Sequence, residues 1–188
     1  MENQKKILQM GLELFAKRGF DAVGVQEIAD AAEITKPTLY HYFGSKEGLL
    51  ESILRKNFSL LFAELEKSAG YHHDVKNTLE AVVRTYFSFA SRHLNFYRFQ
   101  LSCWFSPPQS TAFNAIKQYG KKQQEIFENL FLQAAQDHGN MRGRHQRYAA
   151  SFLGIINTYI GLKTSADMEL DEPVVSNAVH QFMHGIFS

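Results

Sequence analysis

The sequence has few of the residues that cross-link, interrupt or anchor a chain. Its 188 residues contain one cysteine, Cys103, which excludes an intrachain disulfide framework. The four prolines are Pro37, Pro107, Pro108 and Pro173, and they stand between segments of helical periodicity, where helices begin or end. No apolar run approaches the ~18 residues of a membrane span, and the opening MENQKKILQM has no apolar signal-peptide core. These absences predict a soluble, cytoplasmic protein with no membrane partner.

The chain also lacks a surplus of charge of either sign. Its 20 Lys and Arg nearly cancel its 19 Asp and Glu, which leaves a formal net charge of +1. This balance excludes a polybasic protein, so any surface that binds nucleic acid must be local. Hydrophobic residues make up 45% of the chain and charged residues 21%, which is typical of a globular protein.

Alternating runs of Val, Ile and Thr between Gly or Asn turns are absent, which argues against strands. The periodicity instead predicts an all-α fold of about nine helices, the first three forming a small N-terminal unit. The predicted helices cover about residues 3–18, 25–32, 35–44, 45–68, 79–90, 95–105, 110–138, 144–164 and 173–187, of which 95–105 could be one helix or two.

The second and third predicted helices form a helix-turn-helix unit, because only Glu33, Ile34 and Thr35 separate them. The second helix of such a unit can enter the major groove of DNA. Leu39 and Phe43 share the face that must pack inward, which leaves a short polar and aromatic face on the other side. The alternative is a helical bundle with a solvated face, since residues 1–57 hold eight basic and eight acidic side chains.

The stretch FDAVGVQEIADAAEITKPTLYHYFGSKEGLL, together with the preceding ILQMGLELFAKRGF, resembles the N-terminal domain of the TetR/AcrR family of bacterial transcriptional regulators. The resemblance implies a DNA-binding domain over residues 1–47 and an effector-binding and dimerisation domain over 48–188. It implies DNA contacts from residues of the second and third helices and the start of the fourth, with Tyr42 and Lys46 on phosphates. The implied set is Gln26, Thr35, Lys36, Pro37, Thr38, Tyr40, His41, Tyr42 and Lys46.

Glu33 departs from the family pattern, because many relatives carry the turn glycine there. A non-glycine residue in the left-handed conformation costs roughly 1 kcal/mol, so a variant turn is an alternative. The carboxylate of Glu33 also brings a negative charge towards DNA.

Eight of the twenty residues from Tyr86 to Phe105 are aromatic, with polar groups between them. Ligand pockets are mostly apolar with a few placed polar groups, so this cluster is a candidate site for a hydrophobic or aromatic effector. The alternative is a bulky core. The candidate effector-binding residues are Phe89, His93, Phe96, Phe99, Gln100, Cys103, Trp104, Tyr119 and Asn157.

The last two predicted helices carry a second feature. One face of 144–164 repeats small residues where a solvated face would carry Lys and Glu, and the final helix repeats an apolar pattern. Two such helices from each subunit predict a four-helix bundle across a twofold axis, although an intrachain contact is the alternative. The candidate interface residues are Ala150, Gly154, Asn157, Gly161, Val175, Val179, Phe182 and Ile186.

No metal, cofactor or catalytic constellation is expected. His180 and His184 have an i, i+4 spacing that could ligate zinc, but no acidic or Cys partner is nearby in sequence. Cys103 could pair with His93, although a buried inert thiol is the simpler interpretation.

The preferred hypothesis is a homodimeric transcriptional repressor that binds a pseudo-palindromic operator in double-stranded DNA and is released by a small hydrophobic effector. The alternatives are a helical ligand-binding or interaction protein, and a chromosome-organising DNA binder without an effector. An enzyme is not expected.

Overall fold

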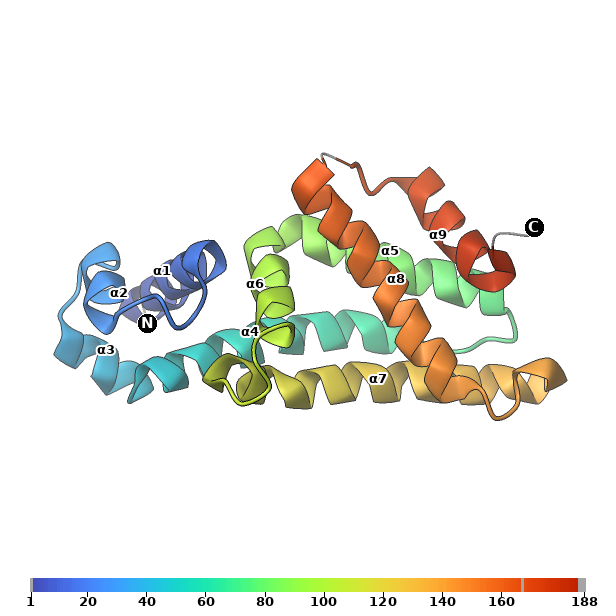
Figure 1. Cartoon of the computed structure of the whole chain (residues 1–188), viewed down its shortest axis with the longest axis horizontal. Coiled ribbons are helices and arrows are strands. Elements are labelled where there is room, and N and C mark those ends of the chain that lie inside the picture. The colour runs from blue at the N-terminus through green and yellow to red at the C-terminus, as the bar shows by residue number, and fades with distance from the viewer. Residues whose placement is uncertain (1, 167, 186–188) are drawn as a thin grey trace. The chain divides into compact units, whose positions relative to one another are not determined.

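The computed structural model describes residues 2–166 and 168–185, and within them every regular element is helical (Figure 1). The elements are α1 (Glu2–Arg18), α2 (Val25–Ala31), α3 (Lys36–Phe43), α4 (Lys46–Ser68), α5 (Val75–Arg92), α6 (Leu94–Trp104), α7 (Thr111–Asp137), the 3₁₀ turn η1 (Gly139–Met141), α8 (His145–Ala166) and α9 (Glu172–His184). The predicted all-α fold is therefore confirmed, and 95–105 forms one helix.

The helix ends follow from capping residues that the sequence displays. Gly19 ends α1 with a φ of 81°, and Gly44 ends α3 with a φ of 73°, a region that glycine enters without steric cost. The Thr35 hydroxyl accepts a hydrogen bond from the Thr38 amide at the start of α3, and the Ser45 hydroxyl accepts one from the Gly48 amide at the start of α4.

The packing divides the chain into two compact units. The first comprises Met1–Ser59 with His93–Gln118, and the second comprises Leu60–Arg92 with Tyr119–Ser188. The helices α4 and α7 contribute residues to both units. This division by packing differs from the predicted boundary after residue 47, because α6 and the start of α7 pack with the N-terminal helices.

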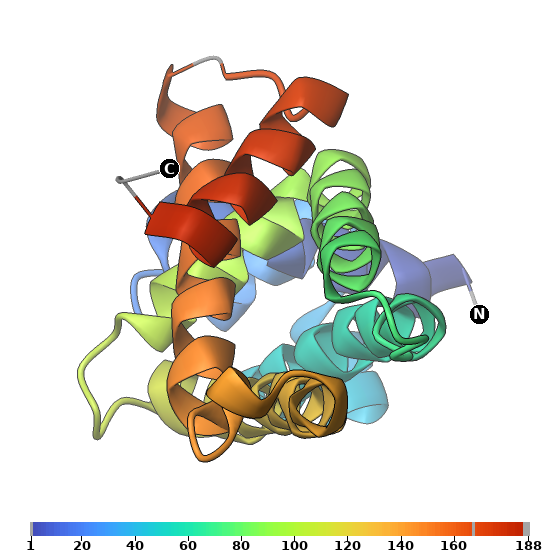
Figure 2. The same ribbon diagram turned by 90° about the vertical axis from the view of Figure 1, so that its right-hand side faces the viewer.

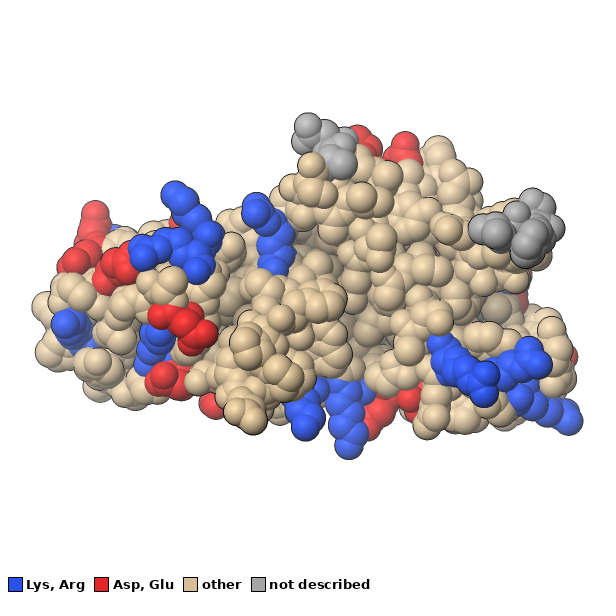
Figure 3. All heavy atoms as spheres, in the orientation of Figure 1, with Lys and Arg blue, Asp and Glu red and all other residues tan. Residues whose placement is uncertain are grey.

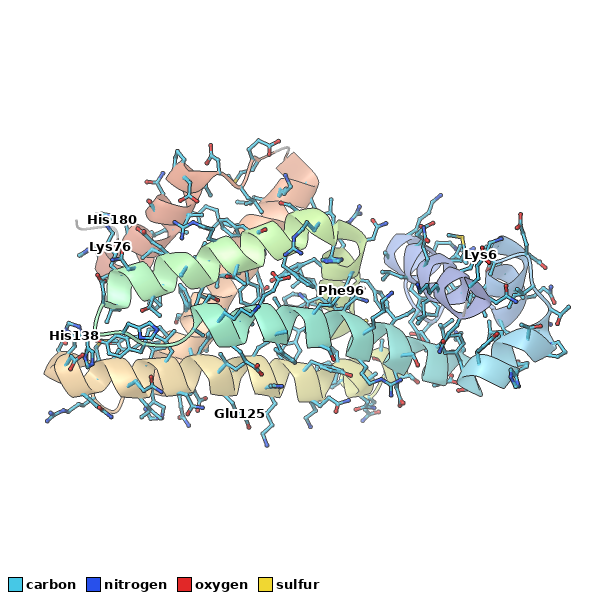
Figure 4. The ribbon with its side chains drawn as sticks, turned by 180° about the vertical axis from the view of Figure 1, so that it is seen from behind. Lys6, Lys76, Phe96, Glu125, His138 and His180 are labelled. Atoms are coloured by element: carbon cyan, nitrogen blue, oxygen red, sulfur yellow. The ribbon has the colours of Figure 1, made fainter. Side chains whose placement is uncertain are left out.

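Aromatic side chains hold α6 in the first unit. The Phe99 ring stacks on the Phe15 ring of α1 with centroids 5.6 Å apart. Phe96 points from α6 towards α4 (Figure 4), where its ring meets the edge of Phe58 at 5.2 Å. All four side chains are buried, so much of the aromatic cluster predicted from the sequence forms the core of this unit.

In the second unit, α9 lies across α8 and beside α5 (Figure 2). Val175 and Val179 are buried by this packing, and the Arg84 guanidinium of α5 donates two hydrogen bonds to the Glu172 carboxylate of α9, at 2.6 and 2.8 Å. These contacts fasten α9 within its own chain.

The loop before α5 is fastened to the end of α7. The Tyr71 hydroxyl donates a hydrogen bond to Asp137 Oδ2 at 2.8 Å, and His73 Nδ1 lies 2.7 Å from the same oxygen. The hydrogen bonds from Tyr71 and His73 lower the pKa of Asp137. Burial and the hydrogen bond to Asp137 raise the pKa of Tyr71 to about 12. None of the described helices is both long and apolar enough to cross a bilayer.

Candidate nucleic-acid interface

The turn between α2 and α3 fixes the angle at which α3 leaves the unit. The Ile34 amide donates to the Ala29 carbonyl at 3.0 Å, and the Glu33 amide donates to the Asp30 carbonyl at 3.0 Å. Glu33 has a φ of 54°, so the left-handed conformation is kept despite the missing glycine. Its carboxylate forms an ion pair with Lys6 of α1, which lowers the pKa of Glu33.

The α3 helix has one buried side and one exposed side. Leu39 is fully buried, as the sequence predicts, whereas Tyr40 on the next position is 45% exposed. Lys36, Pro37 and His41 are also exposed. The exposed side therefore offers an aromatic ring, an imidazole and an ammonium group, which can contact thymine methyls, base edges and phosphates.

The charge around α3 is more favourable to DNA than the neutral composition of the N-terminal region indicates. The α3 sequence KPTLYHYF contains no Asp or Glu. The nearby carboxylates of Glu27 and Glu33 are paired with Arg18 and Lys6. The α3 segment itself thus carries the positive charge of Lys36 and no carboxylate, which suits a small DNA-binding surface.

Several of the predicted DNA-contacting residues have partners inside the protein. The hydroxyl groups of Thr35 and Thr38 form a hydrogen bond at 2.9 Å. Gln26 Nε2 donates a hydrogen bond to Asp30 Oδ1 at 2.6 Å. Tyr42 is half-buried, with its ring against the edge of His41 at 5.4 Å. The threonine pair stabilises the start of α3, and Gln26 is exposed in the first turn of α2.

Lys46 has a structural role that the sequence does not reveal. Its Nζ donates to the carbonyl oxygens of Phe20 and Val23 at 3.1 and 3.0 Å, and it lies 4.2 Å from the centroid of the Phe20 ring. The ammonium group therefore holds the loop between α1 and α2 against the start of α4. The partners precede Lys46 by more than twenty residues, so no local sequence signal indicates this role.

The predicted effector-binding residues are divided between the two units. Phe89, Tyr119 and Asn157 belong to the second unit, and the other six belong to the first. Phe89, Phe96, Phe99, Gln100 and Cys103 are buried, and burial raises the pKa of the Cys103 thiol to about 12, as expected of an inert thiol. Trp104 is 42% exposed, and His93, Tyr119 and Asn157 are half-buried. Contact with an effector stays a prediction.

The predicted interface residues need a correction. Val175 and Val179 face the interior of the second unit, 2% and 0% exposed, so these two side chains cannot contact a partner. The apolar face of α9 packs against α5 and α8 of the same chain instead. Ala150 and Gly154 are exposed on α8, Asn157, Gly161 and Phe182 are half-buried, and Ile186 lies outside the described residues. These positions stay a prediction.

The two histidines of α9 lie side by side, with ring centroids 4.7 Å apart. Across residues 2–166 and 168–185, no group of three or more His, Cys, Asp or Glu is arranged to hold a metal ion.

The sequence profile described as "Bacterial regulatory proteins, tetR family" matches residues 7–53, which span α1 to the first turns of α4. Over these residues the chain is similar to the TetR family. Among curated relatives, the repressor KstR2 of Rhodococcus jostii is 41% identical over 80 residues, covering 43% of this chain and 39% of that protein. The activator FasR of Mycolicibacterium smegmatis is 32% identical over 97 residues, covering 52% and 44%. The chain thus spans less than half the length of these curated relatives.

Several solved structures match nearly the whole chain in fold. FadR from Bacillus subtilis, solved in complex with stearoyl-CoA, has a TM-score of 0.80 at 21% identity and covers 97% of this chain and 98% of its own. AibR, solved with isovaleryl coenzyme A and operator DNA, has a TM-score of 0.74 at 24% identity and covers 95% and 97%. At these identities the likeness establishes the fold of both units.

Proposed function

We propose that the protein is a sequence-specific DNA-binding transcriptional regulator, a homodimeric repressor that a small hydrophobic effector releases from its operator. It acts in the cytoplasm and carries out no catalytic step. The observation that carries this proposal is α3, whose buried Leu39 fixes the helix while Tyr40, His41 and Lys36 stand exposed on a segment without acidic residues.

A dimer explains how a small and nearly neutral DNA-binding domain can bind its operator. Two recognition helices about one turn of DNA apart read a pseudo-palindromic site and add two modest half-site energies. The Tyr40 ring and the His41 imidazole contact base edges, and the Lys36 ammonium adds charge at the start of α3.

The acyl-CoA thioesters are the effectors to test first. Two proteins of the same fold were solved with stearoyl-CoA and with isovaleryl coenzyme A, the second also with operator DNA. An effector that favours one arrangement of the two DNA-binding domains by about 1–3 kcal/mol changes operator affinity roughly 5–150-fold. Since α4 contributes residues to both units, it is the continuous element through which we propose the change passes.

Fluorescence anisotropy with a duplex selected by the wild-type protein tests the DNA-binding surface. We expect Tyr40→Ala to weaken binding by about 1–3 kcal/mol, the usual cost of a lost base contact. Lys36→Gln should weaken binding and lower the salt dependence by about one phosphate contact. Lys67→Gln, an exposed lysine of α4 in the second unit, is the control. Unchanged affinity in both α3 variants would contradict the proposal.

Adding acyl-CoAs of short and long chain to the same complex tests the effector. Release by one chain-length class and not by the other supports a shaped apolar site. A complex that no acyl-CoA and no other hydrophobic compound releases would identify a DNA binder without an effector.

A further inference from the structure

The first unit contains an open groove between α1 and α6 that the DNA-binding surface does not use. Its volume is about 350 Å³, and it is lined by Glu13, Ala16 and Lys17 of α1 and by Asn95 and Arg98 of α6. Figure 3 shows basic side chains standing over α1 and over α6 on this face. The small side chain of Ala16 leaves room between the polar groups.

Lys17 and Arg98 bring two positive charges to this groove from segments far apart in sequence. Within the part of the chain that the structure describes, neither cation has an ion pair or a hydrogen bond, whereas Lys6 and Arg18 of α1 are paired with carboxylates. Glu13 is the one acidic side chain of the described lining, and its Oε1 accepts a hydrogen bond from Gln9 at 3.1 Å. The groove therefore keeps a net positive charge.

We propose that this groove binds the phosphate groups of a small phosphorylated ligand. The Arg98 guanidinium has the planar donor geometry that fits two phosphate oxygens, and the Lys17 ammonium supplies a second charge. The Asn95 amide adds a neutral donor. Two cations on different helices match a dianion better than the single charge of a carboxylate.

That the ligand acts as an effector rests on the proposed function, whereas the binding of phosphate in the groove does not. An acyl-CoA carries its acyl chain on a phosphorylated nucleotide, so this groove would take the phosphorylated part of such an effector. Binding there would also bridge α1, the first helix of the DNA-binding domain, to α6. The groove is a contact for the effector and is separate from the face of α3.

The DNA backbone is the other source of phosphate, and the arrangement of the first unit argues against it. The α3 helix packs on α2, and α2 packs on α1. The groove is lined by α1 and α6, and Figure 1 shows α6 on the side of α1 away from α3. A duplex that contacts Tyr40 and His41 therefore meets a different side of the unit.

Calorimetric titration of the full chain with inorganic pyrophosphate and with coenzyme A, without DNA, tests the assignment. We expect both probes to bind the wild-type protein. Lys17→Gln and Arg98→Gln should each weaken binding about three- to tenfold, the effect of losing one partly exposed charge contact. Glu13→Gln removes the opposing charge and should tighten binding by up to about fivefold.

Matched controls separate this effect from general loss of charge or stability. Lys67 stands in the last turn of α4 as Lys17 stands in the last turn of α1, and both are exposed. Arg142 is an exposed arginine outside the groove. Lys67→Gln and Arg142→Gln should leave probe binding unchanged, and circular dichroism should show that all variants are folded.

Two results would overturn the assignment. One is a wild-type protein that binds neither probe, or groove variants that bind both as tightly as wild type. The other is loss of operator affinity in the groove variants with unchanged pyrophosphate binding, which would make the groove a DNA contact. Weakened probe binding in a protein that binds no operator would support the groove and contradict the proposed regulator.

Discussion

Glu33 adopts a left-handed backbone conformation that residues other than glycine disfavour. Its φ of 54° lies in the region that side chains other than glycine enter at a cost. The ion pair with Lys6 and the hydrogen bonds that the Glu33 and Ile34 amides donate hold the turn in place. The family resemblance marks the position as unusual, but the sequence cannot show whether the turn keeps its shape.

Substitution at Glu33 separates the backbone cost from the ion pair. Both Glu33→Ala and Glu33→Gly lose the pair with Lys6, so this loss cancels between them. Only alanine keeps the left-handed strain, so we expect the glycine variant to be more stable by about 1 kcal/mol. Urea unfolding measures the difference, and equal stability or a more stable alanine variant would show that the turn is not strained.

Lys46 provides a second test at the residue scale. Lys46→Met keeps an unbranched side chain beside Phe20 but removes the donors to the Phe20 and Val23 carbonyls. We expect a loss of about 1–2 kcal/mol in the free energy of unfolding, because two carbonyl oxygens lose their partner. Operator affinity should fall for all sequences alike. A variant as stable as wild type would mean that the loop is held by other contacts.

At the scale of elements, the junction of α3 and α4 leaves no space for a side chain. A Cβ atom on Gly48 would lie 2.0 Å from the Phe43 carbonyl oxygen. That oxygen belongs to the backbone at the end of the recognition helix, so it can move only if α3 moves. The position of α3 therefore depends on the absence of a side chain in the first turn of α4.

We expect Gly48→Ala to destabilise the protein by at least about 2 kcal/mol and to weaken operator binding. Gly11→Ala is the comparison, because its Cβ would meet the tip of the Leu49 side chain at 2.9 Å. A side-chain tip can turn aside, so this variant should lose less. Thermal melts and anisotropy measure both effects. An alanine at residue 48 that is tolerated better than one at residue 11 would contradict this view of the junction.

The contact between α5 and α9 predicts a dependence on pH. The Arg84 guanidinium lowers the pKa of Glu172 from its ordinary value of 4.5 through hydrogen bonds. A carboxyl with a lowered pKa in the folded state contributes stability above its ordinary value and loses it as the pH falls. The docking of α9 should therefore weaken below pH 4.5.

Hydrogen exchange of the α9 amides at neutral pH and below pH 4.5 follows this contact. Because amide exchange is intrinsically slower in acid, the measured quantity is protection relative to intrinsic exchange; we expect this protection to fall in acid in the wild-type protein and to fall less in Glu172→Gln, which has no charge to lose. Glu66→Gln, an exposed carboxylate of α4, is the control. The same response to acid in wild type and Glu172→Gln would rule out this ion pair as the cause.

At the scale of the whole molecule, the exposed small residues of α8 are where we expect a second copy. Ala150 and Gly154 stand exposed, and a Cβ on Gly154 would meet nothing within 4 Å in the protomer. Gly154→Glu should therefore leave the protomer folded but convert a dimer into a monomer. Sedimentation measures the mass, with Ser88→Glu on the exposed side of α5 as the control. A dimer that persists in Gly154→Glu would place the interface elsewhere.

The sequence predicts those parts of the fold that depend on neighbouring residues. The caps at Thr35 and Ser45 and the buried Leu39 follow from local pattern, and the structure confirms them. Periodicity also identifies the apolar face of α9, but it cannot show that α5 and α8 cover Val175 within the same chain. The groove between α1 and α6 depends on contacts between distant segments, for which a single sequence has no signal.

The proposed function requires that α3 read DNA sequence as part of a dimer. Selection of binding sites by the 188-residue chain from random duplex DNA, at two salt concentrations, tests this requirement. We predict enrichment of a twofold-symmetric site, with binding that weakens steeply as salt rises because phosphate contacts release counterions. No enrichment by a folded, ligand-free dimer would contradict the proposed function.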